Sequence, residues 1–176
     1  SPTDMGVNMA GNCIVDDEVC QRASEQEIIR RYYKCLCDIK RGKECRDDLY
    51  KLELIMKQAG LGVENREVVG AALAREEETG HPAAAVMLPD GKIVTGRTTD
   101  LLGASAAVLL NAIKELAGID HNIKLVSPEA IEPIQTLKTD YLGSRNPRLH
   151  TDEILIALSI SATRNADAKL ALKQTS

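Results

Sequence analysis

The spacing of the apolar residues changes near His81, and this change constrains the fold more than any other feature of the sequence. Before it, apolar residues recur every three or four positions, which is typical of amphipathic helices. Three helices are predicted, over residues 16–41, 46–59 and 64–79. After it, short apolar runs alternate with turn residues. We therefore expect a helical region with an N-terminal arm over residues 1–80 and an α/β domain over residues 81–176, with the boundary near Gly80.

The second part of the chain has the order of elements of a small α/β domain. A β-hairpin is expected where residues 82–88 and 92–95 flank Pro-Asp-Gly, because proline and glycine preset the backbone angles of a turn. The elements expected after it are a helix over residues 102–117, capped near Thr99 or Asp100, a strand over residues 123–126, a helix over residues 127–141, a helix from Thr151 and a helix over residues 167–173. This order predicts a three-layer α/β domain with a small mixed sheet.

The composition argues against several classes of partner. The chain contains no Phe and no Trp, so the stacking platforms of many nucleic-acid-binding proteins are missing. Its net charge is −4, with acidic and basic residues interspersed, so no broad basic surface is expected. No apolar run reaches the roughly 18 residues that a membrane helix needs. We therefore expect neither a nucleic acid nor a membrane as a partner.

The cysteines indicate a reducing compartment. They are five in number and all lie between Cys13 and Cys45, whereas the disulfides of a secreted protein pair evenly and span the fold. We therefore expect a cytoplasmic protein. Cys35 and Cys37 point in different directions on a helix, so they cannot share a zinc ion. With no other metal-ligand spacing, no metal is expected in this chain, and the sequence identifies no other cofactor.

Two polar segments, at residues 96–105 and 144–150, stand before predicted helices and are candidates for binding an anion. The ligand-binding candidates are Arg97, Thr98 and Ser105 in the first segment and Arg145, Asn146, Arg148 and His150 in the second. Free N–H groups and the dipole at a helix start favour phosphate or carboxylate. His150 is also a candidate general base, which Asp152 or Glu153 could orient. The alternative is that both segments are ordinary capped connections.

The order hairpin, helix, strand, helix over residues 82–141 resembles the core of the zinc-dependent cytidine deaminases. In that family the helix carries His-Ala-Glu or Cys-Ala-Glu, and the strand leads into Pro-Cys-x-x-Cys. Here the helix has Ala107, Val108 and Leu109, and the strand leads into Pro-Glu-Ala-Ile at residues 128–131. The resemblance implies a deaminase-like scaffold without its metal chemistry.

Three longer motifs resemble one bacterial family. They are Ser-Pro-Thr-Asp-Met-Gly-Val-Asn-Met-Ala-Gly-Asn-Cys at residues 1–13, Gln-Glu-Ile-Ile-Arg-Arg-Tyr-Tyr at residues 26–33 and Leu-Gly-Ser-Arg-Asn-Pro-Arg-Leu-His-Thr-Asp-Glu at residues 142–153. They are similar to the C-terminal part of the uncharacterised domain-of-unknown-function family 1846. Members are sometimes labelled ATP-dependent peptidases or zinc proteases, and the family has a phosphate-loop-like stretch upstream. This chain has neither Gly-x-x-x-x-Gly-Lys-Ser/Thr nor His-Glu-x-x-His, so its own residues do not support those labels.

Two functions from different classes remain open. In the first, the chain is the C-terminal domain of a larger bacterial protein and binds a nucleotide or phosphorylated metabolite, together with an upstream domain of the same protein. In the second, the chain is a non-catalytic scaffold that forms a homo-oligomer through exposed helices. The sequence does not decide whether the protein is an enzyme.

Overall fold

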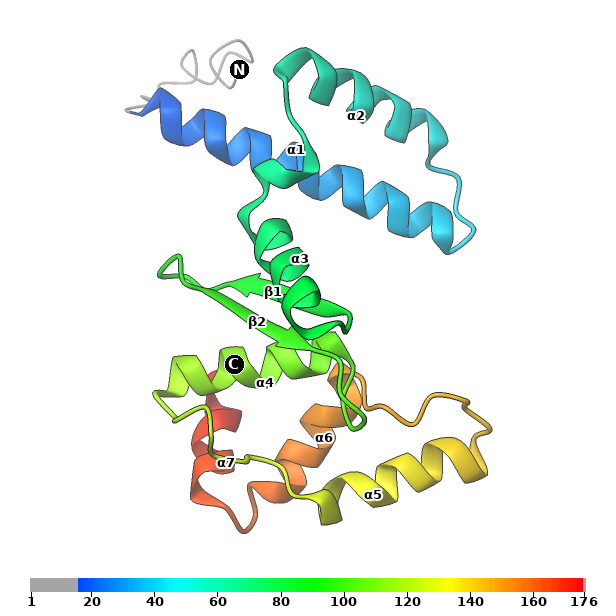
Figure 1. Cartoon of the computed structure of the whole chain (residues 1–176), viewed down its shortest axis with the longest axis vertical. Helices are drawn as coiled ribbons and strands as arrows, with labels where there is room; N and C mark the ends of the chain where they lie inside the picture. The colour runs from blue at the N-terminus through cyan, green and yellow to red at the C-terminus, as the bar shows by residue number, and fades with distance from the viewer. Residues whose placement is uncertain (1–15, 176) are drawn as a thin grey trace. The chain divides into compact units, whose positions relative to one another are not determined.

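The computed structural model describes residues 16–175 (Figure 1). By its internal contacts the chain divides into two compact units, Ser1–Glu67 and Val68–Ser176. The division lies at the start of helix α3 (Glu67–Thr79), so α3 belongs to the second unit. The domain boundary expected near Gly80 stays a prediction, and the predicted N-terminal arm lies outside the described residues.

The first unit is a pair of packed helices, α1 (Asp17–Lys40) and α2 (Arg46–Ala59), followed by the short 3-10 helix η2 (Val63–Asn65). Helix α1 begins where the Asp16 carboxylate accepts a hydrogen bond from the Val19 N–H at 3.0 Å. Helix α2 ends where Gly60 adopts the left-handed conformation, which costs glycine little. Both helices lie close to their predicted ranges, so the predicted helical N-terminal region is confirmed.

The second unit contains the predicted β-hairpin. Strands β1 (Ala83–Met87) and β2 (Ile93–Arg97) pair antiparallel, with Ala83 opposite Arg97 and Met87 opposite Ile93. The turn forms because the Asp90 carboxylate accepts a hydrogen bond from the Lys92 N–H at 3.0 Å and Gly91 has a φ of 84°. Helix α4 (Ala104–Ala117) packs directly on this hairpin.

A layer of helices covers the other side of α4 (Figure 1). Its members are α5 (Pro128–Thr136), the π-helical turn η3 (Leu137–Tyr141), α6 (Thr151–Ser161), α7 (Ala166–Leu172) and the 3-10 helix η4 (Lys173–Thr175). The core shared by α4 and this layer consists of Ala106, Ile113, Ile119, Leu125, Val126, Ile131, Leu149, Ile154, Ala157, Leu158, Ala168 and Ala171. The hairpin and the helices around it confirm the predicted α/β class.

The predicted strand over residues 123–126 is wrong. These residues belong to the connection between α4 and α5, and the sheet in the described part of the chain has two strands. Leu125 and Val126 are buried in the helical core, with exposures of 2% and 8%. A short apolar run in a buried connection has the same pattern as a buried strand, which is why the sequence suggested one. The deaminase-like order of elements is therefore not formed.

The start of α4 also differs from the prediction. The helix begins at Ala104 after Gly103, whereas a cap near Thr99 or Asp100 was expected. The Thr99 hydroxyl instead accepts hydrogen bonds from the N–H groups of Leu101 and Leu102, which closes a turn before the helix. Across residues 16–175, no helix combines the length and apolar character needed to cross a membrane.

Candidate functional site

The two polar segments that precede α4 and α6 lie side by side. Leu102 and Leu149 form an isolated parallel β-bridge, in which the Gly103 N–H donates to the Leu149 carbonyl at 3.0 Å and the Leu149 N–H donates to the Leu101 carbonyl at 2.9 Å. The bridge is parallel, and each of the two segments enters its helix two residues after it. Helices α4 and α6 therefore begin next to each other. We call residues 98–103, between β2 and α4, and residues 142–150, between η3 and α6, the paired loops.

Arg148 adds a second connection between the paired loops. Its Nε donates to the Thr99 carbonyl at 2.7 Å, and the side chain is half-buried. The Asn146 carboxamide oxygen accepts from the Arg148 N–H at 3.1 Å, and the Ser144 hydroxyl hydrogen-bonds to the main chain of Asn146. Arg148 and Asn146 therefore hold the two loops in shape.

The remaining candidates are more accessible. Arg145 and Ser105 are exposed, and Arg145 has no hydrogen-bond or ion-pair partner among residues 16–175. Arg97 is half-buried, and its guanidinium group donates a long hydrogen bond to the Thr98 carbonyl at 3.4 Å. The Thr98 N–H donates to the Pro82 carbonyl and so continues the pairing of the hairpin. Arg145, Arg97 and Ser105 thus have side-chain donors available for a ligand.

His150 stands directly before α6 and close to the start of α4. Its Nδ1 lies 3.8 Å from the position that a Cβ on Gly103 would occupy, and the side chain is exposed. The Glu153 carboxylate accepts a hydrogen bond from the His150 main-chain N–H at 2.7 Å, so it caps the helix without orienting the imidazole ring. No hydrogen bond between Asp152 and this ring occurs in the described structure either. The arrangement expected of a general base is therefore incomplete.

Lys138, which no sequence motif indicated, is a buried charge next to the paired loops. It lies in η3 with an exposure of 8%, and its Nζ donates to the Arg148 carbonyl at 2.7 Å and to the Glu153 carboxylate at 2.8 Å. Burial raises the pKa of Glu153, but the hydrogen bonds from Lys138 and from the His150 N–H lower it more, so the net shift is downward. The spacing of the sequence could have indicated this burial, because Lys138 follows Ile131 and Ile134 at helical spacing and so lies on the same face of the helix.

A second polar cluster lies at the opposite end of α4. The Lys114 Nζ donates to the His121 carbonyl at 2.9 Å, and burial lowers the pKa of Lys114, with Asp120 partly opposing the shift. Glu115 accepts hydrogen bonds from Lys92 and His121, which lower its pKa. These contacts fasten the hairpin and the turn after α4 to the helix, so His121 has a structural role.

The cysteines of the described residues lie in α1 and directly before α2, and all of them are free thiols. Cys35 is buried and Cys37 is exposed, as expected for two positions that point in different directions on α1. A hydrogen bond with the Cys35 thiol, together with burial, raises the pKa of Cys45 to about 11, so this thiol stays protonated at neutral pH. Within residues 16–175, no group of three or more His, Cys, Asp and Glu side chains could hold a metal ion.

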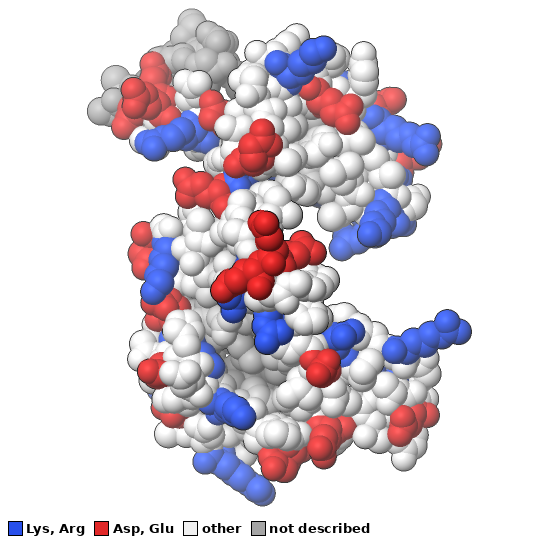
Figure 2. All heavy atoms as spheres, viewed as in Figure 1, with Lys and Arg blue, Asp and Glu red and all other residues white. Residues whose placement is uncertain are grey.

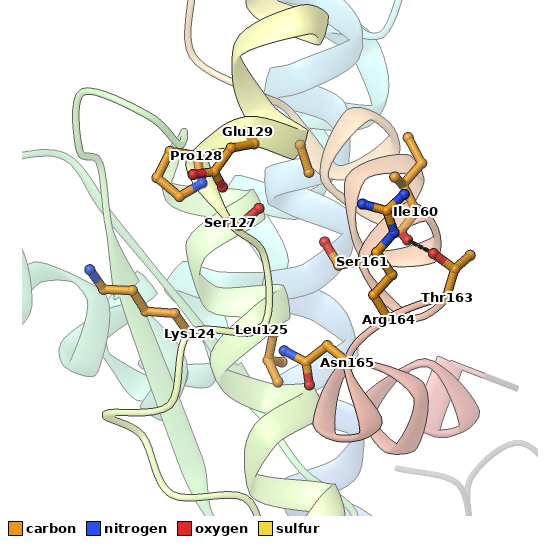
Figure 3. Close-up of a pocket in the computed structure, with 11 residues that line it drawn as sticks. Lys124, Leu125, Ser127, Pro128, Glu129, Ile160, Ser161, Thr163, Arg164 and Asn165 are labelled. Carbon is orange, nitrogen blue, oxygen red and sulfur yellow. Dashed lines mark hydrogen bonds between the residues drawn. The ribbon is translucent and has the colours of Figure 1, made fainter.

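A cavity of about 490 Å³ lies away from the paired loops, between the start of α5 and the C-terminal end of α6 (Figure 3). Its lining includes the basic residues Lys124 and Arg164 and the apolar residues Leu125 and Ile160. Because α6 has 11 residues and an α-helix rises about 1.5 Å per residue, this cavity and the paired loops are separated by about 16 Å. It is a separate feature that no sequence motif indicated.

On the face drawn in Figure 2, acidic and basic side chains are interspersed, and neither sign covers a broad area. A ligand that recognises this chain electrostatically would therefore depend on a local group of donors, such as those of the paired loops.

The comparisons with known proteins define a class of bacterial proteins of unknown function. The N-terminal profile of domain of unknown function DUF1846 matches residues 1–60, and its C-terminal profile matches residues 64–176. The chain belongs to the DUF1846 family. It therefore contains sequence from both regions, and the expectation of a C-terminal part alone was wrong.

The relatives carry the name UPF0371 protein. One from Corynebacterium efficiens is 61% identical over 174 residues, which are 99% of this chain and 35% of the relative. One from Corynebacterium diphtheriae is 58% identical over 174 residues, with the same two shares. One from Streptococcus thermophilus is 56% identical over 176 residues, which are 100% of this chain and 36% of the relative. The chain thus spans about a third of the length of the relatives that it matches.

Proposed function

We propose that the chain forms part of a binding site for a nucleotide or phosphorylated metabolite in a longer bacterial protein. The site is the surface of the paired loops, and the observation that carries the proposal is the parallel bridge between Leu102 and Leu149, which brings two helix starts together. Two converging helix N-termini present free N–H groups and two favourable dipoles to the same anion.

The charges around the bridge support an anionic ligand. Arg145 and Arg97 supply guanidinium groups that can hold a phosphate through two hydrogen bonds, and Ser105 adds a hydroxyl in the first turn of α4. The half-buried Glu153 carboxylate is paired with Lys138, so its repulsion toward an anion is offset. The part of the polypeptide that this chain lacks relative to its relatives would complete the site from the other side of the ligand.

The proposal is tested on the full-length protein by isothermal titration calorimetry with ATP and with inorganic phosphate. The Arg145→Ala variant is expected to bind about 10- to 100-fold more weakly, as for the loss of one hydrogen bond to a charged group, while its Tm changes by less than about 1 °C. Arg164→Ala is the matched control, because Arg164 is also exposed but lies at the other end of α6. Equal binding by the Arg145→Ala variant and the wild type, or no binding by the wild type, would contradict the proposal.

A further inference from the structure

Helix α2 has an apolar stripe on the side that faces away from α1. The side chains of Leu49, Leu52 and Met56 are half-buried or buried and form the face that packs on α1. Tyr50 and Leu54 stand four residues apart on the opposite side, with exposures of 63% and 42%. Residues at this spacing contact each other along a helix, so the two side chains form one continuous apolar surface.

The packing inside the first unit explains why this surface needs a partner. Among residues 16–67, the buried apolar side chains are Ile29, Cys35 and Met56. The second unit, in contrast, has the shared core of a dozen residues described above. Two helices with so small an interface form one layer, and a stable domain requires at least a second layer against its apolar faces.

We propose that the Tyr50 and Leu54 stripe is a docking surface for another part of the N-terminal region of the same polypeptide. The partner is an apolar helix or sheet face in the portion of the full-length protein that this chain does not contain. The first unit belongs to that N-terminal region, because the N-terminal family profile matches residues 1–60. The relatives are almost three times as long as the chain, so sufficient polypeptide exists to form a second layer.

The residue types also fit a buried contact within one protein. Tyrosine and leucine give a large apolar area, and tyrosine is enriched where interfaces gain most of their affinity. Charged residues border the stripe, including Lys51, which pairs with Asp48 at 3.6 Å, and Glu53, which is exposed. An apolar centre with a polar rim is the usual organisation of a protein interface.

The test measures accessibility in the full-length protein. Leu54→Cys and, as a matched control, the neighbouring Glu53→Cys are reacted with N-ethylmaleimide, and the labelled peptides are quantified by mass spectrometry. The thiol introduced at position 54 is expected to react at least about 10-fold more slowly than the thiol at position 53. Equal labelling rates would overturn the proposal. Protection that disappears on dilution would also overturn it, because a second copy of the protein would then be the partner.

A measurement on the wild type covers the case in which the Leu54→Cys variant does not fold. Hydroxyl-radical footprinting of the full-length protein reports the oxidation of Tyr50 directly, with Tyr141, which is 78% exposed here, as the internal comparison. Tyr50 is expected to be protected. Oxidation of Tyr50 at the rate of a fully exposed tyrosine would overturn the proposal.

Discussion

Lys138 connects the loop before α6 to the helix itself, because its ammonium group holds both the Arg148 carbonyl and the Glu153 carboxylate. Replacing it with the apolar Lys138→Met would leave both acceptors without this donor. We expect the free energy of unfolding at pH 7 to fall by about 2–4 kcal/mol, as measured by urea denaturation. Lys124→Met, at an exposed position, is the control and is expected to change it by no more than about 0.5 kcal/mol.

The pH dependence of the same comparison identifies the cause. The pKa of Glu153 is lowered in the folded protein, so its ionised form stabilises the fold fully above its unfolded pKa of about 4.3. This stabilisation is lost as the pH falls through the lower folded pKa. The difference between wild type and Lys138→Met is therefore expected to shrink as the pH falls from about 5 to 3. A difference that stays constant over this range would show that Lys138 acts through its hydrocarbon chain.

At the scale of elements, the contact between the hairpin and α4 depends on a glycine. A Cβ on Gly96 would stand 2.2 Å from the Val108 main-chain nitrogen, and backbone atoms cannot move aside as a flexible side chain can. Gly96→Ala is therefore expected to reduce the free energy of unfolding by about 1–3 kcal/mol, the cost of overpacking. Gly70→Ala in α3 is the control, because a Cβ there meets nothing within 4 Å and alanine favours a helix by about 0.5–1 kcal/mol. Equal Tm values for the two variants would contradict this account.

Local signals were sufficient to predict most elements. Helix α2 was predicted at residues 46–59 from the spacing of its apolar residues, and the hairpin was predicted from Pro-Asp-Gly. The strand over residues 123–126 failed because burial of Leu125 and Val126 is decided by distant helices. Periodicity reports which residues are apolar, whereas the partner that buries them is set by the tertiary fold.

The candidate site likewise has a part that the local sequence predicts and a part that only the tertiary fold decides. Each of the paired loops was predicted from its own polar residues and the helix that follows it. Their adjacency depends on the bridge between Leu102 and Leu149 and on Arg148 reaching Thr99, which are contacts between segments far apart in the sequence. Lys138 was missed because a lysine next to apolar residues usually keeps its ammonium group in water. The two acceptors that allow its burial are provided only by the fold.

At the scale of the whole molecule, the domain boundary follows from where the core is formed. No side chain of α3 is buried, whereas the core residues of the second unit and the hairpin cluster of Leu88, Val94 and Ala112 all lie after Gly80. Residues 81–176 and residues 68–176, each expressed alone, are therefore both expected to unfold in one cooperative urea transition. Removing α3 deletes little buried apolar surface, so the m-values of the two fragments should differ only slightly. Binding of the dye ANS by residues 81–176 but not by residues 68–176 would instead indicate that α3 is required for the core to pack, and the boundary would then lie at Glu67.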